Sequence, residues 1–445
     1  MATGPNQTVH TIAIARAGRV EGLRRRVYRL TVGRGKGALV CRSIDDSVTI
    51  GSHSGNGLVV ADPTVSRFHA RIELDAHGFL LTDLDSTNGT WIGDMRVVSA
   101  YLPLKAKVQL GDVEVAFEVQ RDEKELPLST ADRFGALVGQ SATMRRLFQE
   151  LAQVAASDAT VLLSGETGSG KDLAATEIHR HSARRDRPFV VVDCGGLPES
   201  LIEAELFGHE RGAFTGADSA RAGAFEAADG GTIFLDEVAE LSPPMQAKLL
   251  RAIEARTVKR IGSNDWRKID VRVIAATHQD LARLCNQRLF REDLYFRLAV
   301  VRLRVPPLRE RLDDLPLLVK HALDEIGGAT LDLDERTLAA LRARHWAGNV
   351  RELRNVVQRA VVLGPAALVD ENIGAHAVGG EEPYKEAKAR AIEQFERRYL
   401  EGLLERAGGT VAKAARAADV DPAWLFRLIK RYQIDVTRLR APKAR

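Results

Sequence analysis

Residues 165–171, Gly-Glu-Thr-Gly-Ser-Gly-Lys, constrain the fold of this chain more than any other feature. They follow an apolar run at residues 160–163 and precede a helical pattern. Glycine lets the backbone turn its N–H groups onto a phosphate, and the lysine reaches the β and γ phosphates of a nucleotide. The segment predicts an α/β domain that binds ATP. The predicted ATP-binding residues of the loop are Gly165, Glu166, Thr167, Gly168, Ser169, Gly170, Lys171 and Asp172.

A second nucleotide signature lies at residues 231–237, Gly-Thr-Ile-Phe-Leu-Asp-Glu. Asp236, at the end of the expected strand, is suited to hold Mg²⁺, and Glu237 to polarise the attacking water. Asp172 stands where a Ser or Thr usually touches the magnesium, so a chance glycine-rich turn is the alternative for the loop. For Asp236 and Glu237 the alternative is a solvated acidic turn.

The 445 residues exceed one compact core, and we expect a multidomain chain with three folded parts. Short alternating runs in the first part predict an all-β sandwich, and apolar strands alternating with helical patterns predict a parallel sheet in the middle. The expected segments are a leader at 1–26, an all-β domain at 27–121, a linker at 122–137, an α/β subdomain at 138–305, a helical lid at 306–372, a linker at 373–385 and an all-α domain at 386–445.

Composition limits the compartment and the partners. Three cysteines, odd in number and far apart, provide neither a disulfide framework nor a metal knuckle. No signal-peptide pattern or membrane-length apolar run is present, so we expect a cytoplasmic protein without membrane contact. The net charge is only +4, but residues 411–445 carry nine Lys and Arg against three Asp, which suits a segment that meets nucleic-acid phosphates.

Residues 205–217, Glu-Leu-Phe-Gly-His-Glu-Arg-Gly-Ala-Phe-Thr-Gly-Ala, resemble the surface loop peculiar to sigma-54 activators among AAA+ ATPases. The resemblance extends over residues 137–370, and an acidic residue after the lysine is usual in that family. It implies that the loop motif contacts the sigma factor. The residues given this role are Gly212, Ala213, Phe214, Thr215, Gly216 and Ala217.

The same resemblance assigns three arginines. Residues 290–298 are similar to the family's arginine-finger segment, which implies that Arg291 and Arg297 act in the site of the neighbouring subunit. A guanidinium from the next subunit would stabilise charge on the transferring phosphoryl group only in an assembled ring. Residues 346–355 are similar to the sensor II segment, so Arg351 is expected to contact the nucleotide phosphates. The alternative for the two fingers is a pair of surface arginines in ion pairs.

Two positions depart from the family pattern. Thr277 and His278 take the sensor I place, where the family usually has Thr-Asn, and a structural histidine is the alternative. Asp193 stands where the family commonly has an Asn that restrains the catalytic glutamate. An Asp facing Glu237 would be a like-charge pair that needs a proton or a cation, and the alternative is a loop carboxylate in water.

The first domain resembles a forkhead-associated (FHA) domain over residues 26–120, with Gly51, His69 and Gly89 at its loop positions. In that family an arginine follows the first glycine, but here the residue is Ser52, so the strongest charge-assisted bond to a phosphothreonine is missing. The resemblance implies binding of a phosphothreonine protein, and the alternative is a fold kept for packing. The candidate phosphopeptide residues are Ser52, Ser66, Arg67, Thr87 and Asn88.

Residues 410–431 resemble a Fis-type helix-turn-helix, with Asp421 as the cap of the second helix and Pro422 in its first turn. This helix would enter the major groove of promoter-upstream DNA. The alternative is a helical dimerisation hairpin. The candidate DNA-binding residues are Ala423, Trp424, Arg427, Lys430 and Arg431.

Together these features predict an ATPase that acts as a ring, expected to be a hexamer, and that remodels sigma-54 RNA polymerase under control of the FHA domain. The cofactors implied are ATP and Mg²⁺. Two alternatives stay open: an AAA+ remodeller of other proteins, and a non-catalytic scaffold that binds phosphopeptides and DNA.

Overall fold

The computed structural model describes residues 11–16, 19–33, 39–43, 47–75, 77–215, 217–327, 333–364 and 368, and then residues 400, 403–404, 407, 411–417, 420, 425–426 and 428–429. The chain divides into two compact units, Met1–Val369 and Asp370–Arg445. Among the described residues, no helix combines the length and apolar character needed to cross a membrane.

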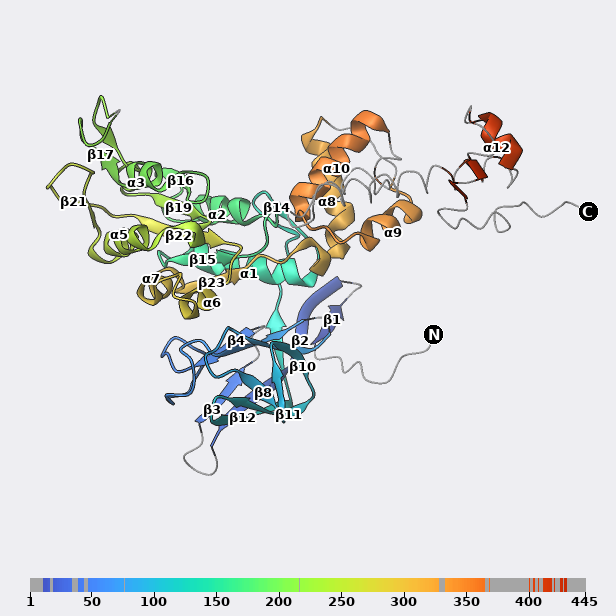
Figure 1. Ribbon diagram of the computed structural model, residues 1–445, viewed down its shortest axis with the longest axis horizontal. Helices are drawn as coiled ribbons and strands as arrows, with labels where there is room; N and C mark the ends of the chain where they lie inside the picture. Colours follow the sequence, from blue (N-terminus) through green and yellow to red (C-terminus); the bar gives the residue numbers. More distant parts are fainter. Residues whose placement is uncertain are drawn as a thin grey trace, which may run out of the picture. The chain divides into compact units, whose positions relative to one another are not determined.

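The first part of the larger unit contains two mainly antiparallel sheets (Figure 1). One has the order β1-β2-β12-β11-β8-β9 with β3 paired to β2, and the other has the order β10-β7-β6-β4-β5. Alternating side chains from both sheets fill one apolar core, in which the rings of Tyr28, Phe79 and Phe117 lie within 5.9 Å of one another. The strands are β1 (Thr11–Arg16), β2 (Arg19–Val32), β3 (Leu39–Ser43), β4 (Ser47–Gly51), β5 (Leu58–Val59), β6 (Ala70–Leu74), β7 (Phe79–Asp83), β8 (Thr90–Ile92), β9 (Met95–Val97), β10 (Ser99–Leu102), β11 (Lys105–Leu110) and β12 (Val113–Pro127).

The start of the chain differs from the expected leader. From Thr11 on it forms β1 and β2, and β12 runs past residue 121 into the expected linker. The extended ends of the two long strands pair in register, and ion pairs join their side chains: Arg24 lies 3.3 Å from the carboxylate of Glu125, and Glu123 approaches Arg24 and Arg26. Basic residues that look like a solvated leader are therefore one side of an antiparallel ladder.

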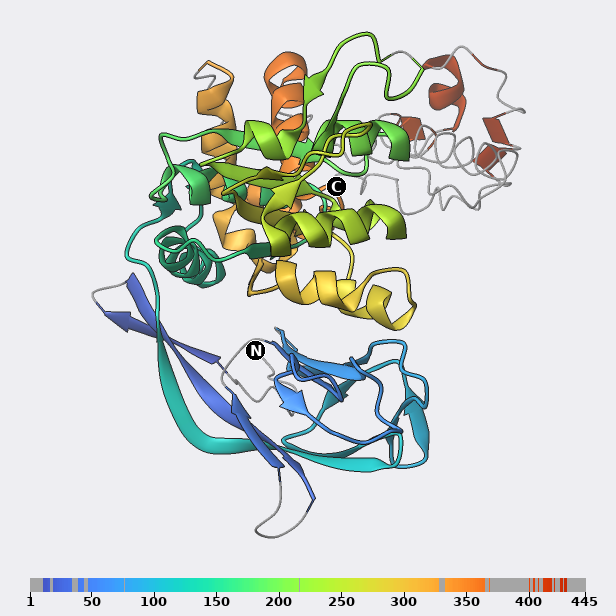
Figure 2. The ribbon, with the colours of Figure 1, turned by 90° about the vertical axis from the view of Figure 1, so that its left-hand side faces the viewer.

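The middle of the chain is a five-stranded parallel sheet of order β16-β19-β22-β15-β23. Its strands are β15 (Val161–Ser164), β16 (Phe189–Asp193), β19 (Thr232–Asp236), β22 (Arg272–Thr277) and β23 (Val301–Arg304). Helices cover both faces (Figures 1 and 2). They are α1 (Ala142–Ala155), α2 (Lys171–Arg180), α3 (Glu199–Phe207), α4 (Ala224–Ala227), α5 (Pro243–Ala255), α6 (Leu281–Asn286) and α7 (Glu292–Leu298).

Alternation along the strands distributes the core between the two faces. In β19, Phe234 packs with α1 and α2, whereas its neighbours Ile233 and Leu235 pack with the cluster that includes α3 and α5. Strands buried on both faces are nearly continuous apolar runs, which is the pattern that the sequence shows there. Because the strands are parallel, the carboxyl ends of β15, β19 and β22 lie at the same edge of the sheet, where the loops after them come together.

A small helical lid follows β23. It consists of two short 3-10 turns, η3 (Leu308–Glu310) and η4 (Leu312–Asp314), and of the helices α8 (Leu315–Glu325), α9 (Glu335–Ala343) and α10 (Asn349–Leu363), which pack around Trp346. In the second unit the described residues include α12 (Val411–Ala417) and an apolar cluster around Leu404 and Leu425. The structure confirms the predicted all-β and α/β folds. The predicted DNA-reading residues 423, 424, 427, 430 and 431 lie outside the described residues.

Candidate functional site

The loop from Gly165 to Gly170 joins β15 to α2, as predicted. Gly168 and Gly170 have φ angles of 76° and 110°, which favour glycine, so the loop can wrap its amides around an anion. Lys171 is the first residue of the ten-residue helix α2 and is 4% exposed, and its ammonium donates to the Gly165 carbonyl at 3.0 Å. Inside this loop the buried hydroxyl of Ser169 has no hydrogen-bond partner. The arrangement is suited to a phosphate group.

Three carboxyl groups surround the lysine. Burial, and then the neighbouring carboxylates of Asp172 and Glu237, raise the pKa of Asp236 to about 6. The ammonium of Lys171 lies 3.4 Å from the Glu237 carboxylate. Neighbouring carboxylates that disfavour the charged form of Asp236 favour binding of a further cation, and hard oxygen donors suit Mg²⁺. No group of three His, Cys, Asp or Glu side chains in the described part of the chain could hold a metal ion alone, so a magnesium here would also need phosphate oxygens.

Glu237 begins the turn after β19 in a left-handed conformation, with φ 49°. Such a conformation is uncommon for a residue other than glycine and is found often at functional sites. The carboxylate accepts a hydrogen bond from the His278 backbone N–H at 3.1 Å and lies 2.7 Å from the ring Nδ1 of the same residue. Burial tends to raise the pKa of Glu237, but the hydrogen bonds from His278 and the charge of Lys171 outweigh it, and the pKa is lowered.

The hydrogen-bond partners of Asp193 differ from those expected of a residue that restrains Glu237. Its Oδ1 accepts hydrogen bonds from the backbone N–H groups of Gly195 and Gly196, at 2.9 and 3.2 Å. The Asp193 side chain therefore stabilises a turn in its own loop. Thr277 is buried at the end of β22, and its hydroxyl accepts from the Gln279 N–H at 2.9 Å. Among the interactions described, only His278 of the three residues Asp193, Thr277 and His278 contacts Glu237.

The lid contacts the phosphate loop through the predicted Arg351 and through three residues that sequence reasoning missed, Val350, Asn349 and Arg311. The backbone N–H groups of Val350 and Arg351 approach the Gly168 carbonyl at 3.0 and 3.4 Å, and the Arg351 side chain is exposed. Asn349 donates to the Glu166 carboxylate and to the Thr167 carbonyl, both at 3.1 Å. The buried guanidinium of Arg311 donates to the Ser169 carbonyl at 2.7 Å. The signal available for Asn349 was its position as the first residue of a strongly periodic helix.

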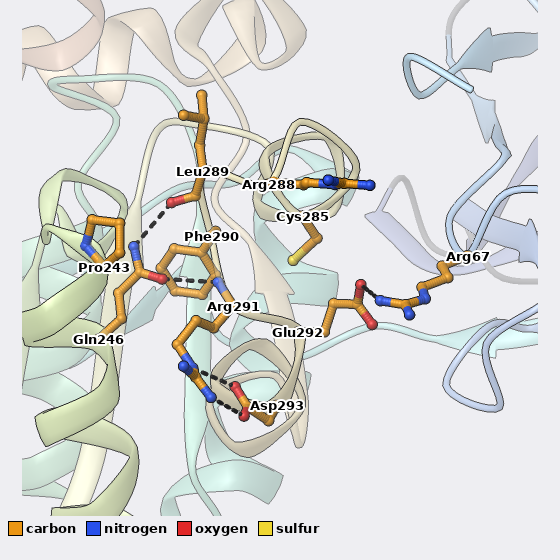
Figure 3. A pocket seen from close by; sticks show the side chains of 10 residues that line it. All are labelled: Arg67, Pro243, Gln246, Cys285, Arg288, Leu289, Phe290, Arg291, Glu292 and Asp293. Atoms are coloured by element: carbon orange, nitrogen blue, oxygen red, sulfur yellow. Dashed lines mark hydrogen bonds and ion pairs between the residues drawn. The ribbon is translucent and has the colours of Figure 1, made fainter. Parts of the chain in front are cut away.

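The two predicted arginine fingers, Arg291 and Arg297, both form ion pairs within the chain. Arg291 lies just before α7 and pairs with Asp293 at 2.7 Å, as Figure 3 shows, while Arg297 pairs with Glu254 at 2.8 Å. The Gln246 side chain fixes the start of α7, since it accepts from the Arg291 N–H and donates to the Leu289 carbonyl (Figure 3). Both guanidinium groups are about half exposed, so they can exchange partners at little cost.

The loop at residues 212–217 lies between two short strands, β17 (Gly208–His209) and β18 (Arg221–Ala222), and Figure 1 shows it projecting beyond the sheet. It is closed by the hydrogen bond from Gly212 N–H to the Ala217 carbonyl at 2.8 Å. Phe214 is 41% exposed and Thr215 is exposed, whereas Ala217 is buried. Gly216 lies outside the described residues. The large exposed ring is available to a partner.

A second loop supports the first. It connects β20 (Thr257–Val258) with β21 (Arg267–Lys268), and Ile261 exchanges backbone hydrogen bonds of 2.9 Å with Glu210 and Gly208. Arg260 bridges the carboxylates of Glu210 and Glu226. The base of the projecting loop is thus held rigidly while its tip stays exposed.

In the all-β domain the predicted loop residues come together. The Ser66 hydroxyl accepts from the Thr87 N–H at 2.9 Å, the Asn88 amide donates to the Thr64 carbonyl at 2.8 Å, and Ser52 N–H donates to the Ser66 carbonyl at 3.0 Å. Buried His69 braces these loops through Gly89, and burial lowers its pKa. These contacts place Ser52, Ser66, Thr87 and Asn88 around one end of the sandwich.

The same loops contact α6 and α7. Arg67 pairs with Glu292 (Figure 3), and Asp85 pairs with Arg283 at 2.6 Å. The ring of Phe68 packs against those of Tyr295 and Phe296, with centroids 5.2 and 5.7 Å away. Arg67, one of the candidate phosphopeptide residues, therefore has a carboxylate partner in Glu292, the residue after Arg291.

The chain matches three families: the Sigma-54 interaction domain over residues 137–304, the FHA domain over 48–111 and the AAA+ ATPase lid domain over 309–389. It is 44% identical to the transcriptional regulatory protein ZraR of Escherichia coli K12 over 316 residues, which cover 69% of this chain and 71% of that protein. It is 42% identical to the C4-dicarboxylate transport transcriptional regulatory protein DctD of Pseudomonas aeruginosa, over 74% of this chain and 72% of that protein. The crystal structure of NtrX from Brucella abortus in complex with ATP is similar with a TM-score of 0.50 and 33% identity, over 68% of this chain and 71% of that one.

Proposed function

Because this chain belongs to the family of sigma-54-dependent transcriptional regulators, we propose that it couples ATP hydrolysis to remodelling of sigma-54 RNA polymerase. The carrying observation is the pairing of Lys171 with Glu237 next to Asp236, in a domain that also presents the exposed loop of Phe214 and Thr215. A phosphate site and a projecting contact loop on one rigid sheet are what such coupling requires.

In this proposal the loop amides and Lys171 bind the phosphates, and Asp236 holds Mg²⁺. The magnesium, when bound, neutralises charge on the phosphate oxygens. Glu237 orients the attacking water and accepts its proton. Arg351 and Asn349, at the start of α10, couple the conformation of the phosphate-binding loop to that of the lid. The hydrogen bond from the Val350 N–H to the Gly168 carbonyl supports this role.

We further propose that Arg291 and Arg297 complete the site of an adjacent subunit in a hexameric ring. Their present ion pairs, with Asp293 and Glu254, are exposed, and a phosphate would readily replace these carboxylates.

Upstream DNA is the proposed ligand of the helix-turn-helix, through Ala423, Trp424, Arg427, Lys430 and Arg431. Because the target polymerase works in the cytoplasm, this is the proposed compartment.

The test of the proposed ATPase uses purified full-length protein. Lys171→Ala removes the ammonium that binds phosphate and should abolish turnover and weaken ATP binding, whereas Glu237→Gln should abolish turnover and largely keep binding. Lys248→Ala, which breaks an exposed ion pair with Glu203 on the surface, is the matched control and should hydrolyse ATP normally. Normal turnover by both site variants would refute the assignment.

A further inference from the structure

The two carboxylate oxygens of Glu237 have separate partners. Oε2 receives both the backbone N–H and the ring Nδ1 of His278, at 3.1 and 2.7 Å. Oε1 lies 3.4 Å from the ammonium of Lys171. An imidazole whose Nδ1 lies beside a carboxylate donates there when that nitrogen carries the proton. One oxygen is thus held by a single residue through two donors, and the other by a group expected to leave when phosphate binds.

His278 reaches Glu237 because of strand order. β19 and β22 are neighbours in the sheet, and Glu237 and His278 are the residues directly after them. Position 193 lies at the end of β16, on the other side of β19, and is paired in register with Asp236, the residue before Glu237. However, Oδ1 of Asp193 accepts hydrogen bonds from the backbone N–H groups of Gly195 and Gly196. A second carboxylate there would repel Glu237 rather than hold it.

We infer that His278 is the positioning residue of Glu237 in this chain, in place of the side chain at position 193. The inference rests on the proposed role of Glu237 as the base. His278 fixes Oε2, so the rotation of the carboxylate is set before the nucleotide arrives. When the phosphates draw Lys171 away, Oε1 becomes the free acceptor for the proton of the attacking water. A base oriented by a third group is a common arrangement in hydrolytic sites.

The experiment compares four variants by steady-state ATP hydrolysis. His278→Ala should lower kcat by about 10- to 100-fold and change KM by less than about threefold, because orientation is lost while phosphate binding is kept. His278→Asn should recover most of the activity, since its Nδ2 is attached to Cγ as Nδ1 is in histidine. His278→Gln, with its amide one bond farther away, should be as slow as His278→Ala. Asp193→Asn keeps Oδ1 for the glycine amides and should stay within about twofold of the parent.

A double variant separates positioning from a general structural effect. Glu237→Gln should retain only a slow residual single-turnover rate, and in that background His278→Ala should cause no further fall in it, because both changes act through one group. An independent, additive fall would overturn the inference, as would normal kcat in His278→Ala and His278→Gln. If Asp193→Asn changes kcat and His278→Ala does not, position 193 is the restraint. Normal turnover by Glu237→Gln alone would instead refute the proposed function.

Discussion

The guanidinium of Arg309 donates to both carboxylate oxygens of Glu166, at 2.7 and 2.5 Å. Glu166 belongs to the phosphate-binding loop and Arg309 to η3, the first turn of the lid, although 143 positions separate them in the sequence. This ion pair and the contact of Asn349 with the same carboxylate join the lid to the loop.

Loss of the pair should loosen the lid. Arg309→Ala is expected to weaken lid docking by about 0.2–1 kcal/mol, the range of a partly exposed ion pair, and so to speed hydrogen exchange at the Leu308 amide about 1.5- to 5-fold. That amide is bonded to the Asn349 side chain at 2.8 Å. Arg342→Ala, which breaks an exposed pair with Glu335, is the control and should leave this amide unchanged.

The effect should depend on pH. The hydrogen bonds from Arg309 lower the pKa of Glu166, so the pair stabilises the docked lid above the ordinary pKa of a glutamate and is lost as the pH falls through the lowered pKa. The exchange rates of the parent and of Arg309→Ala should therefore converge in acid. A difference that stays constant to low pH would contradict the ion pair as the cause.

Asp236→Asn should stabilise the metal-free ATPase domain while abolishing turnover. The pKa of Asp236 is raised from 3.8 to about 6, so the folded state binds more protons than the unfolded state in that window, and stability falls as the pH rises through it. Above pH 6 the penalty amounts to about 3 kcal/mol at most, and an amide removes it. Thermal melts without nucleotide should show a higher Tm for the variant at pH 7.5 and a smaller gain at pH 5. An equal or lower Tm at pH 7.5 would argue against electrostatic strain at this carboxylate.

Arg291→Ala should hydrolyse ATP at least about 1,000-fold more slowly than the parent, the lower end of the cost of a missing arginine finger. Mixing it with Lys171→Ala subunits should restore part of the activity, because one subunit supplies the pocket and the other the finger. Arg185→Ala is the control, since it removes an arginine from an exposed pair with its neighbour Asp186. Failure of verified mixed rings to recover any activity would exclude action between subunits.

Binding of phosphothreonine peptides to the FHA domain should be weak, because Ser52 offers no guanidinium and Arg67 is paired with Glu292. Ser52→Arg should strengthen binding, and Glu292→Gln should do so by releasing Arg67. Titration calorimetry with a phosphothreonine peptide and its unphosphorylated form measures both effects. Tight binding by the parent that Ser66→Ala and Asn88→Ala do not weaken would contradict this use of the loops.

Local patterns made the phosphate loop, Asp236, Glu237 and the loop at 212–217 predictable, since each is a continuous motif next to a strand or helix. Contacts that depend on strand order or on lid docking were not. The bond between His278 and Glu237 requires β22 beside β19, and the pair of Arg309 with Glu166 requires the lid. Likewise, the arginines at 24–26 read as a leader because their acidic partners lie about 100 residues later.

Thr215→Ala tests the central claim, that hydrolysis and polymerase contact are carried by different residues. Thr215 is exposed on a loop whose base is fixed through Ile261, away from the motifs that bind phosphate, so its methyl and hydroxyl groups should not be needed for folding or turnover. ATPase rate, ring assembly and open-complex formation with sigma-54 polymerase are measured on one preparation. The account predicts normal hydrolysis and assembly with no open complexes. Full promoter opening by Thr215→Ala, or equal loss of hydrolysis and assembly, would contradict it.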